Sequence, residues 1–188
     1  MEIRGEIMRK ILMFLFVIFF AAVYMHAGLV TLELKGSFFS PSEQAFKDVY
    51  GGGSMFGGEI SLGIWKNLEI WIGGSYFSQN GELTYTGEET SLQIIPLGGG
   101  LKYRITKGVL NFYGGAGLNY FNYKESNVIG DVKTGAVGFV TKVGAYLEPV
   151  ELFVIDFFVE YSYCKMTPAD FTINIGGIKA GIGIGVRL

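Results

Sequence analysis

From Leu29 onward, hydrophobic and polar residues alternate with a period of two, and the chain shows no helical periodicity there. This alternation is typical of β-strands, because successive side chains of a strand point to opposite faces of the sheet. Each block has about ten residues or more, which is enough to cross a bilayer at a tilt. The sequence therefore predicts eight strands, at 29–40, 54–65, 68–79, 90–105, 109–123, 135–148, 151–164 and 174–188.

The connections between these strands alternate in length. Short turns at one end and long polar loops at the other are typical of antiparallel up-and-down barrels of the bacterial outer membrane. In such barrels the turns face the periplasm and the loops face outside, so an even number of strands leaves both termini periplasmic. The turns are expected at 66–67, 106–108 and 149–150, and the loops at 41–53, 80–89, 124–134 and 165–173.

Charged residues mark one face of the predicted sheet. Where a strand carries two charges well inside it, their spacing is even, so both side chains point to the same face. The charges in this phase are five acids and six bases, and buried charges persist only when they are paired. We therefore expect ion pairs inside the barrel among Glu33, Lys35, Glu59, Glu69, Lys102, Arg104, Lys142, Asp156, Glu160, Lys179 and Arg187.

The opposite face is almost entirely apolar or glycine. A soluble lipocalin-type barrel would show the same alternation with the faces swapped, so periodicity alone does not say which face lies outside. Glycines on the charged face favour a crowded interior, which an eight-stranded barrel has. Bulky residues expected to fill this interior are Trp71, Phe77, Tyr113, Phe121, Tyr146 and Phe158.

Aromatic residues on the apolar face gather toward the strand ends, as they do at the two interfaces of a membrane. This distribution also favours lipid on the outside. The girdle at the loop end is expected to contain Phe38, Phe56, Tyr76, Tyr120, Tyr161 and Tyr163, and the girdle at the turn end Tyr103, Phe112 and Phe153.

The N-terminus has the pattern of a secretory signal peptide. Arg9 and Lys10 precede a 13-residue apolar run at 11–23, which is shorter than the roughly 20 residues of a membrane-spanning helix. We expect a helical signal peptide at residues 1–27, cleaved after Ala27, and an outer-membrane barrel domain at 28–188. Met8 is an alternative start, because the stretch before it adds nothing to the signal.

The chemistry of the chain argues against an enzyme. Its one histidine, His26, lies in the signal peptide, and its one cysteine, Cys164, has no partner for a disulfide or a metal site. Asp156 and Glu160 would lie roughly 13 Å apart along a strand, too far for joint acid–base work. We expect no catalytic residues, cofactor or metal, and the net charge of −2 argues against nucleic acid.

The loops offer no readable partner. Loop 41–53, which contains Phe46 and Tyr50, and loop 124–134 have the composition of ordinary solvated loops. The glycine runs at 98–100, 114–117 and 181–185 precede no helical pattern, so a phosphate-binding loop is not expected.

Residues 94–104, 112–120 and 181–188 resemble the outer-membrane protein β-barrel domain family, the small OmpA/OmpX-like barrels. The resemblance implies a monomer in outer-membrane lipid, inserted by the barrel-assembly machinery. That machinery reads a C-terminal strand ending in an aromatic residue, whereas this chain ends in Leu188. The function expected is a structural, adhesive or surface-exposed role. The alternatives are a narrow porin-like channel for small solutes and a soluble periplasmic barrel that binds an apolar ligand.

Overall fold

The computed structural model describes residues 30–82, 89–128, 130–150, 152–167 and 172–188. The expected signal peptide, residues 1–27, lies outside these ranges. Among the described residues, no helix is both long and apolar enough to cross a membrane.

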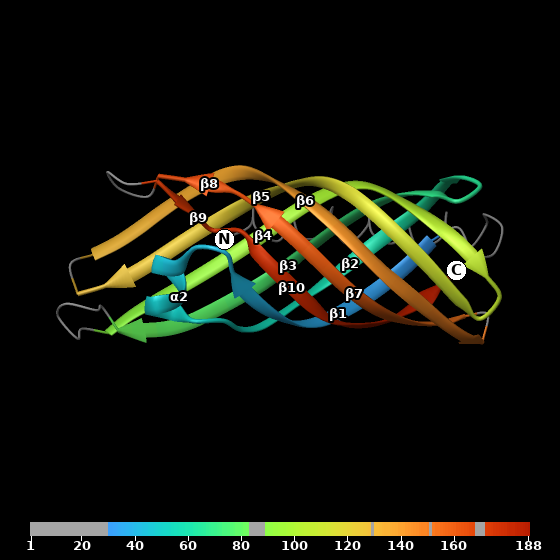
Figure 1. Ribbon diagram of the computed structural model, residues 1–188, viewed down its shortest axis with the longest axis horizontal. Helices are drawn as coiled ribbons and strands as arrows, with labels where there is room; N and C mark the ends of the chain where they lie inside the picture. Colours follow the sequence, from blue (N-terminus) through green and yellow to red (C-terminus); the bar gives the residue numbers. More distant parts are fainter. Residues whose placement is uncertain (1–29, 83–88, 129, 151, 168–171) are drawn as a thin grey trace, which may run out of the picture.

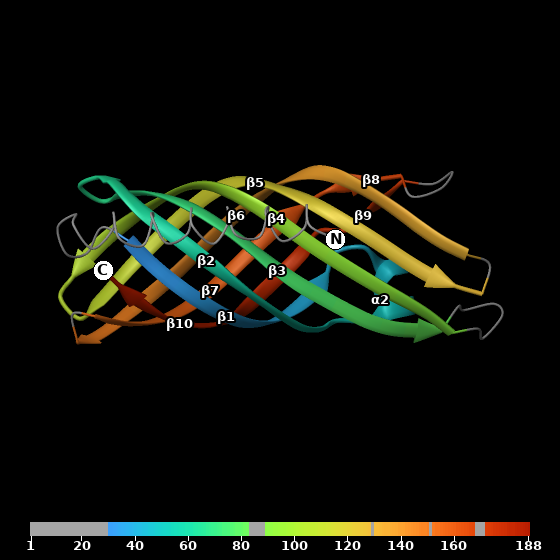
Figure 2. The same cartoon turned by 180° about the vertical axis from the view of Figure 1, so that it is seen from behind.

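Eight long strands form one closed antiparallel barrel, in which each strand pairs with its sequence neighbours and the last pairs with the first (Figures 1 and 2). This confirms the expected up-and-down barrel. The strand order around the barrel is β1-β10-β7-β6-β5-β4-β3-β2. The strands are β1 (Val30–Pro41), β2 (Gly53–Trp65), β3 (Leu68–Glu82), β4 (Glu89–Lys107), β5 (Leu110–Asn127), β6 (Gly130–Val150), β7 (Phe153–Tyr163) and β10 (Gly177–Arg187).

The end of the barrel opposite the short turns carries three further elements, seen on the left of Figure 1. They are the helix α2 (Gln44–Tyr50) and the short strands β8 (Lys165–Met166) and β9 (Ile173–Asn174), which pair with each other. The C-terminus lies at the opposite end, with the short turns. We call the end with α2 the outer end and the end with the short turns the inner end.

Two of the expected long loops are largely strand. The pairing of β3 with β4 continues to Glu82 and Glu89, and that of β5 with β6 continues to Asn127 and Gly130. The prediction of a loop at 124–134 was therefore wrong, and that at 80–89 was too long. Polar residues at this end of the strands still satisfy their backbone groups in the ladder, so polarity there does not indicate a loop.

The apolar face of the barrel lies outside and the charged face inside. Leu34, Phe56, Ile72 and Ile184 are more than half exposed, whereas the alternate positions are buried. Phe153 and Tyr161 are both exposed on β7. Eight residues apart, they are separated by about 26 Å along the strand and about 20 Å along a tilted barrel axis. Such an apolar band, flanked by aromatic residues, suits a bilayer.

Several inward-facing glycines are needed because the interior is crowded. A Cβ atom on Gly117 of β5 would lie 2.3 Å from the backbone oxygen of Gly99 and 2.8 Å from Cζ2 of Trp71. Trp71 can therefore lie across the lumen only because Gly117 has no side chain.

Candidate functional site: the barrel lumen

The lumen contains two different fillings, one above the other along the barrel axis. Near the outer end it holds a cluster of apolar side chains, and toward the inner end it holds charged and tyrosine side chains. We call the first the outer plug and the second the inner network. The buried residues of the outer plug are Phe39, Phe46, Tyr50, Met55, Phe77, Leu92, Ile94, Phe121, Tyr123, Cys164, Met166 and Ile175.

Helix α2 supplies part of the outer plug. Its Phe46 and Tyr50 are four residues apart, so they share one face of the helix, and both are buried with ring centroids 5.3 Å apart. The hydroxyl of Tyr50 hydrogen-bonds Thr90 Oγ1 at 3.0 Å, and burial raises the pKa of Tyr50. The interpretation of 41–53 as a solvated loop was therefore wrong.

The docking of α2 depends on a glycine of β3. A Cβ atom on Gly81 would lie 2.4 Å from the backbone oxygen of Val49 and 3.0 Å from Cδ1 of Tyr50. The helix ends at Gly51, whose φ of 65° lies in the left-handed region that favours glycine. The β1–β2 connection can thus fold back over the lumen and cover it.

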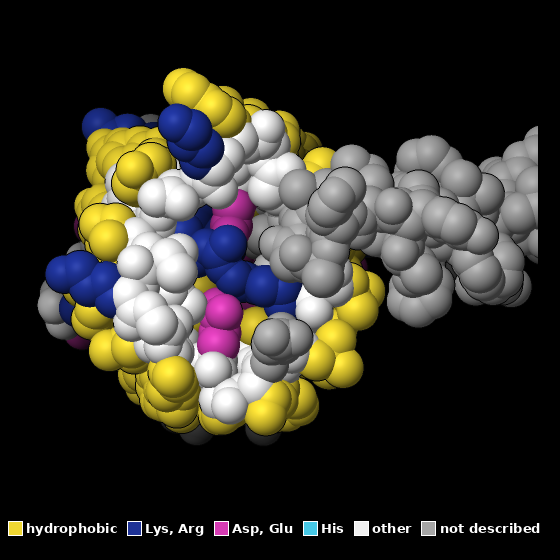
Figure 3. All heavy atoms as spheres, turned by 90° about the vertical axis from the view of Figure 1, so that its right-hand side faces the viewer, with side chains coloured by type: hydrophobic (Ala, Val, Ile, Leu, Met, Phe, Trp, Pro, Cys, Tyr) yellow, Lys and Arg dark blue, Asp and Glu magenta, His cyan; other side chains and the backbone are white. Residues whose placement is uncertain are grey.

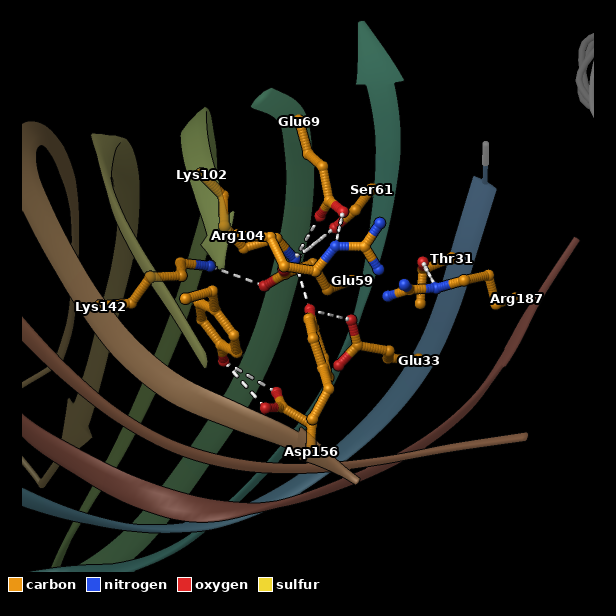
Figure 4. Close-up of polar contacts among 12 residues, drawn as sticks. Thr31, Glu33, Glu59, Ser61, Glu69, Lys102, Arg104, Lys142, Asp156 and Arg187 are labelled. Atoms are coloured by element: carbon orange, nitrogen blue, oxygen red, sulfur yellow. Dashed lines mark hydrogen bonds and ion pairs between the residues drawn. The ribbon is translucent and has the colours of Figure 1, made fainter. Parts of the chain in front are cut away.

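Glu59 of β2 is the centre of the inner network (Figure 4). Its carboxylate lies 2.6 Å from Lys142 Nζ, 3.1 Å from Lys35 Nζ and 3.2 Å from Lys102 Nζ. These lysines come from three different strands, β6, β1 and β4. One acid thus holds together side chains that lie far apart in the sequence.

Lys102 of β4 is fully buried and has several oxygen partners. Its ammonium donates to Ser61 Oγ at 2.8 Å and to the hydroxyl of Tyr146, and it lies 3.4 Å from the Glu69 carboxylate. Tyr146 donates in turn to Glu33 at 2.9 Å. The charge of Lys102 is therefore compensated through a continuous chain of hydrogen bonds and ion pairs.

Asp156 and Glu160 of β7 belong to different parts of the network. Asp156 accepts from the Tyr113 hydroxyl at 3.0 Å and pairs with Lys35 at 3.0 Å. Glu160 pairs with Lys179 at 2.7 Å. The two carboxylates thus pair with different cations, as expected of ion pairs that stabilise the structure.

At the inner mouth, two arginines share a carboxylate that the sequence analysis did not include. Arg104 pairs with Glu69 at 3.2 Å, and Glu148 lies 3.6 Å from Arg104 and 3.0 Å from Arg187. Figure 3 shows charged side chains in the centre of this end and hydrophobic side chains around the wall. Glu148 brings the acids to six, against six bases. Glu148 is separated from Lys142 and Tyr146 by even numbers of residues, and this spacing would have placed it on the lumen face. It was not included because it is the last residue of the predicted strand.

A small cavity separates the two fillings. It has a volume of about 30 Å³ and is lined by Lys35, Glu59, Trp71, Lys142 and Phe158 among others. This is room for roughly one to three ordered waters. The indole Nε1 of Trp71 is buried without a hydrogen-bond partner among the described residues, so a water there would satisfy it. No cluster of His, Cys, Asp or Glu in the described ranges could hold a metal ion.

Comparison with known proteins gives a match in fold only. No family model and no curated protein sequence matches the chain. Among solved structures, Neisserial surface protein A is similar over 87% of this chain and 100% of its own, with a TM-score of 0.63 and 16% identity.

Two further structures show the same likeness. The outer membrane protein OprG of Pseudomonas aeruginosa matches over 86% of this chain and 96% of its own, with a TM-score of 0.66 and 12% identity. The attachment invasion locus protein Ail of Yersinia pestis matches over 87% and 100%, with a TM-score of 0.56 and 17% identity. The protein therefore has the fold of the small eight-stranded outer-membrane β-barrels.

Proposed function

We propose that the protein is an integral barrel of the bacterial outer membrane with a sealed lumen and a structural or adhesive role at the cell surface. The observation that carries the proposal is the filling of the lumen over both of its halves, by the outer plug and by the inner network. The cavity between them has a volume of only about 30 Å³, and the charged side chains of Lys35, Glu59 and Lys142 are part of its lining.

The outer wall supports insertion in lipid. Its exposed side chains are large and apolar between the two aromatic girdles, and a soluble barrel would place such residues inside. The described residues do not support the apolar-ligand alternative, because the cavity between the outer plug and the inner network is small and lined in part by charged residues.

The orientation follows from the lengths of the connections. The short turns and the C-terminus would face the periplasm, and the extended β3–β4 and β5–β6 hairpins would face outside. To test this in cells, Asn80→Cys at the outer end and Thr106→Cys at the inner end are each introduced with Cys164→Ser. A membrane-impermeant maleimide should label intact cells carrying the first variant only. Labelling of Thr106→Cys alone would show the reverse orientation.

Similar barrels at cell surfaces support the adhesive role. One solved structure with this fold is Neisserial surface protein A, and another is the attachment invasion locus protein Ail, which is also known in complex with the heparin analogue sucrose octasulfate. In this chain, the surface available for such contacts would be the outer ends of β3 to β6, which extend past the outer girdle.

A narrow channel is the competing function, because the inner mouth exposes charged side chains. Planar-bilayer recording separates the two functions. The sealed lumen predicts no stable unitary conductance from the refolded protein, while a porin refolded in parallel conducts. Reproducible single-channel steps from this protein would overturn the proposal in favour of the channel.

A further inference from the structure

A groove lies on the lateral wall of the barrel at the outer end, across β4, β5 and β6. It has a volume of about 450 Å³. Several polar side chains line it. Those that matter here are Gln93, Asn122, Lys124 and Lys133, with Gly135 beside them.

The strand register places these residues in rows across the three strands. Lys124 lies opposite Gln93 on one side and opposite Lys133 on the other. The next row toward the membrane contains Asn122 and Gly135. The hydroxyl of Tyr120 lies across Gly135, 2.2 Å from where a Cβ atom would be, so the absence of a side chain on Gly135 makes room for the Tyr120 ring along the groove.

The two lysines form an unfavourable pair unless an anion joins them. Like charges directly opposite on neighbouring strands destabilise a sheet. Asp131 compensates one of the two, since its carboxylate lies 3.5 Å from Lys124 Nζ. A hydrogen bond from Ser126 and the charge of Lys124 lower the pKa of Asp131, so that it is ionised. The three side chains together leave one positive charge at the groove.

The groove lies at the level of lipid headgroups. Tyr120 belongs to the outer aromatic girdle, and Lys124 is four residues further out on the same strand. This spacing corresponds to about 13 Å along the strand and about 10 Å along the barrel axis. The row with Leu97, Tyr120 and Val137 lies below it, and two of these residues are more than half exposed.

We propose that this groove binds the phosphorylated sugar headgroup of an outer-leaflet saccharolipid of the lipid A class. Lys124 and Lys133 contact the phosphate, Asn122 and Gln93 hydrogen-bond the sugar, and the apolar row below receives the acyl chains. The inference rests on the proposed orientation, which places this end of the barrel in the outer leaflet. It adds a specific lipid as a ligand of the barrel wall.

The test measures lipid binding by the full mature barrel in neutral detergent, by native mass spectrometry. The probes are bisphosphorylated lipid A, the same lipid after removal of both phosphates, and phosphatidylglycerol. The variant Lys124→Gln/Lys133→Gln is compared with Lys66→Gln/Lys107→Gln, whose lysines are exposed at the inner turns. Loss of one lysine contact should weaken binding about fivefold, and loss of two about 25-fold.

The expected result is preferential binding of bisphosphorylated lipid A, lost in the outer variant and kept in the inner one. Equal weakening in both variants, or equal affinity for the dephosphorylated lipid or for phosphatidylglycerol, would overturn the proposal. Saturation of the groove by inorganic phosphate at the affinity of the lipid would overturn it as well. The maleimide labelling reads the orientation independently, so failure of the lipid site and failure of the orientation are distinguishable.

Discussion

The outer plug and the inner network fill the same cylinder by different physical means. In the plug, apolar side chains pack without needing specific partners, as in the edge-to-face contact of Phe39 and Phe77 at 5.2 Å. In the network, each charge depends on others, because an unpaired ion in this surrounding is costly. The barrel is therefore closed twice, by two fillings that differ in their sensitivity to substitution.

The largest expected difference comes from isosteric substitutions in the two regions. Glu59→Gln leaves three ammonium groups without their shared carboxylate and should lower the free energy of unfolding by about 3–5 kcal/mol. The matched substitution in the plug, Leu92→Met, should cost less than about 1.5 kcal/mol. Urea unfolding of the refolded protein in detergent, followed by heat-modifiable migration, measures both. Equal costs would contradict the distinction between the two regions.

Helix α2 should leave the outer plug when its contact with Gly81 is disrupted. Gly81→Val places side-chain atoms where α2 packs and should release the helix, with a loss of about 1–3 kcal/mol. Trypsin cleavage after Lys47, which lies in α2, reports the release. Asn80→Val, an outward-facing neighbour, is the control and should leave Lys47 protected. Protection of Lys47 in Gly81→Val would show that α2 does not depend on this contact.

Within the inner network, the stability losses caused by two substitutions should not be additive. Glu160→Gln leaves Lys179 without its partner at 2.7 Å, and Lys179→Met removes that cation. The double variant should therefore be more stable than the sum of the single losses predicts, by about 1–2 kcal/mol. Additive losses in a double-mutant cycle would mean that the pair is not coupled.

The smallest effect concerns the thiol of Cys164 in the outer plug. Burial raises the pKa of Cys164 to about 11, so the thiol is protonated and unreactive at pH 8 and becomes a thiolate only as the pH rises past 11. A maleimide should react slowly with the folded wild type and faster with Gly81→Val, in which the plug is opened. Rapid reaction of the folded wild type at pH 8 would contradict a closed plug.

The barrel wall was predictable because period-two alternation is a local signal. The even spacing of Glu33 and Lys35, or of Asp156 and Glu160, assigns a face without knowledge of the partner strand. The closed order of strands then follows from short connections. The same signal extends to Glu148, whose place at a strand end beside Pro149 left it out.

The outer end was less predictable because its structure depends on contacts distant in sequence. Helix α2 has seven residues, too few to be stable alone, and it forms against the barrel mouth through Phe46 and Tyr50. The partners of each lysine were not predictable either. Lys142 reaches Glu59 across 83 positions of the chain, and alternation carries no information on such a pair.

Closure of the lumen from both ends can be measured at Trp71, which lies between the two fillings. The chain has two tryptophans, so Trp65→Phe leaves Trp71 as the only indole emitter. Quenching by acrylamide should be much weaker in the folded barrel than in urea, because Trp71 is 3% exposed. Quenching of the folded protein to the extent seen in urea would show that the lumen is open.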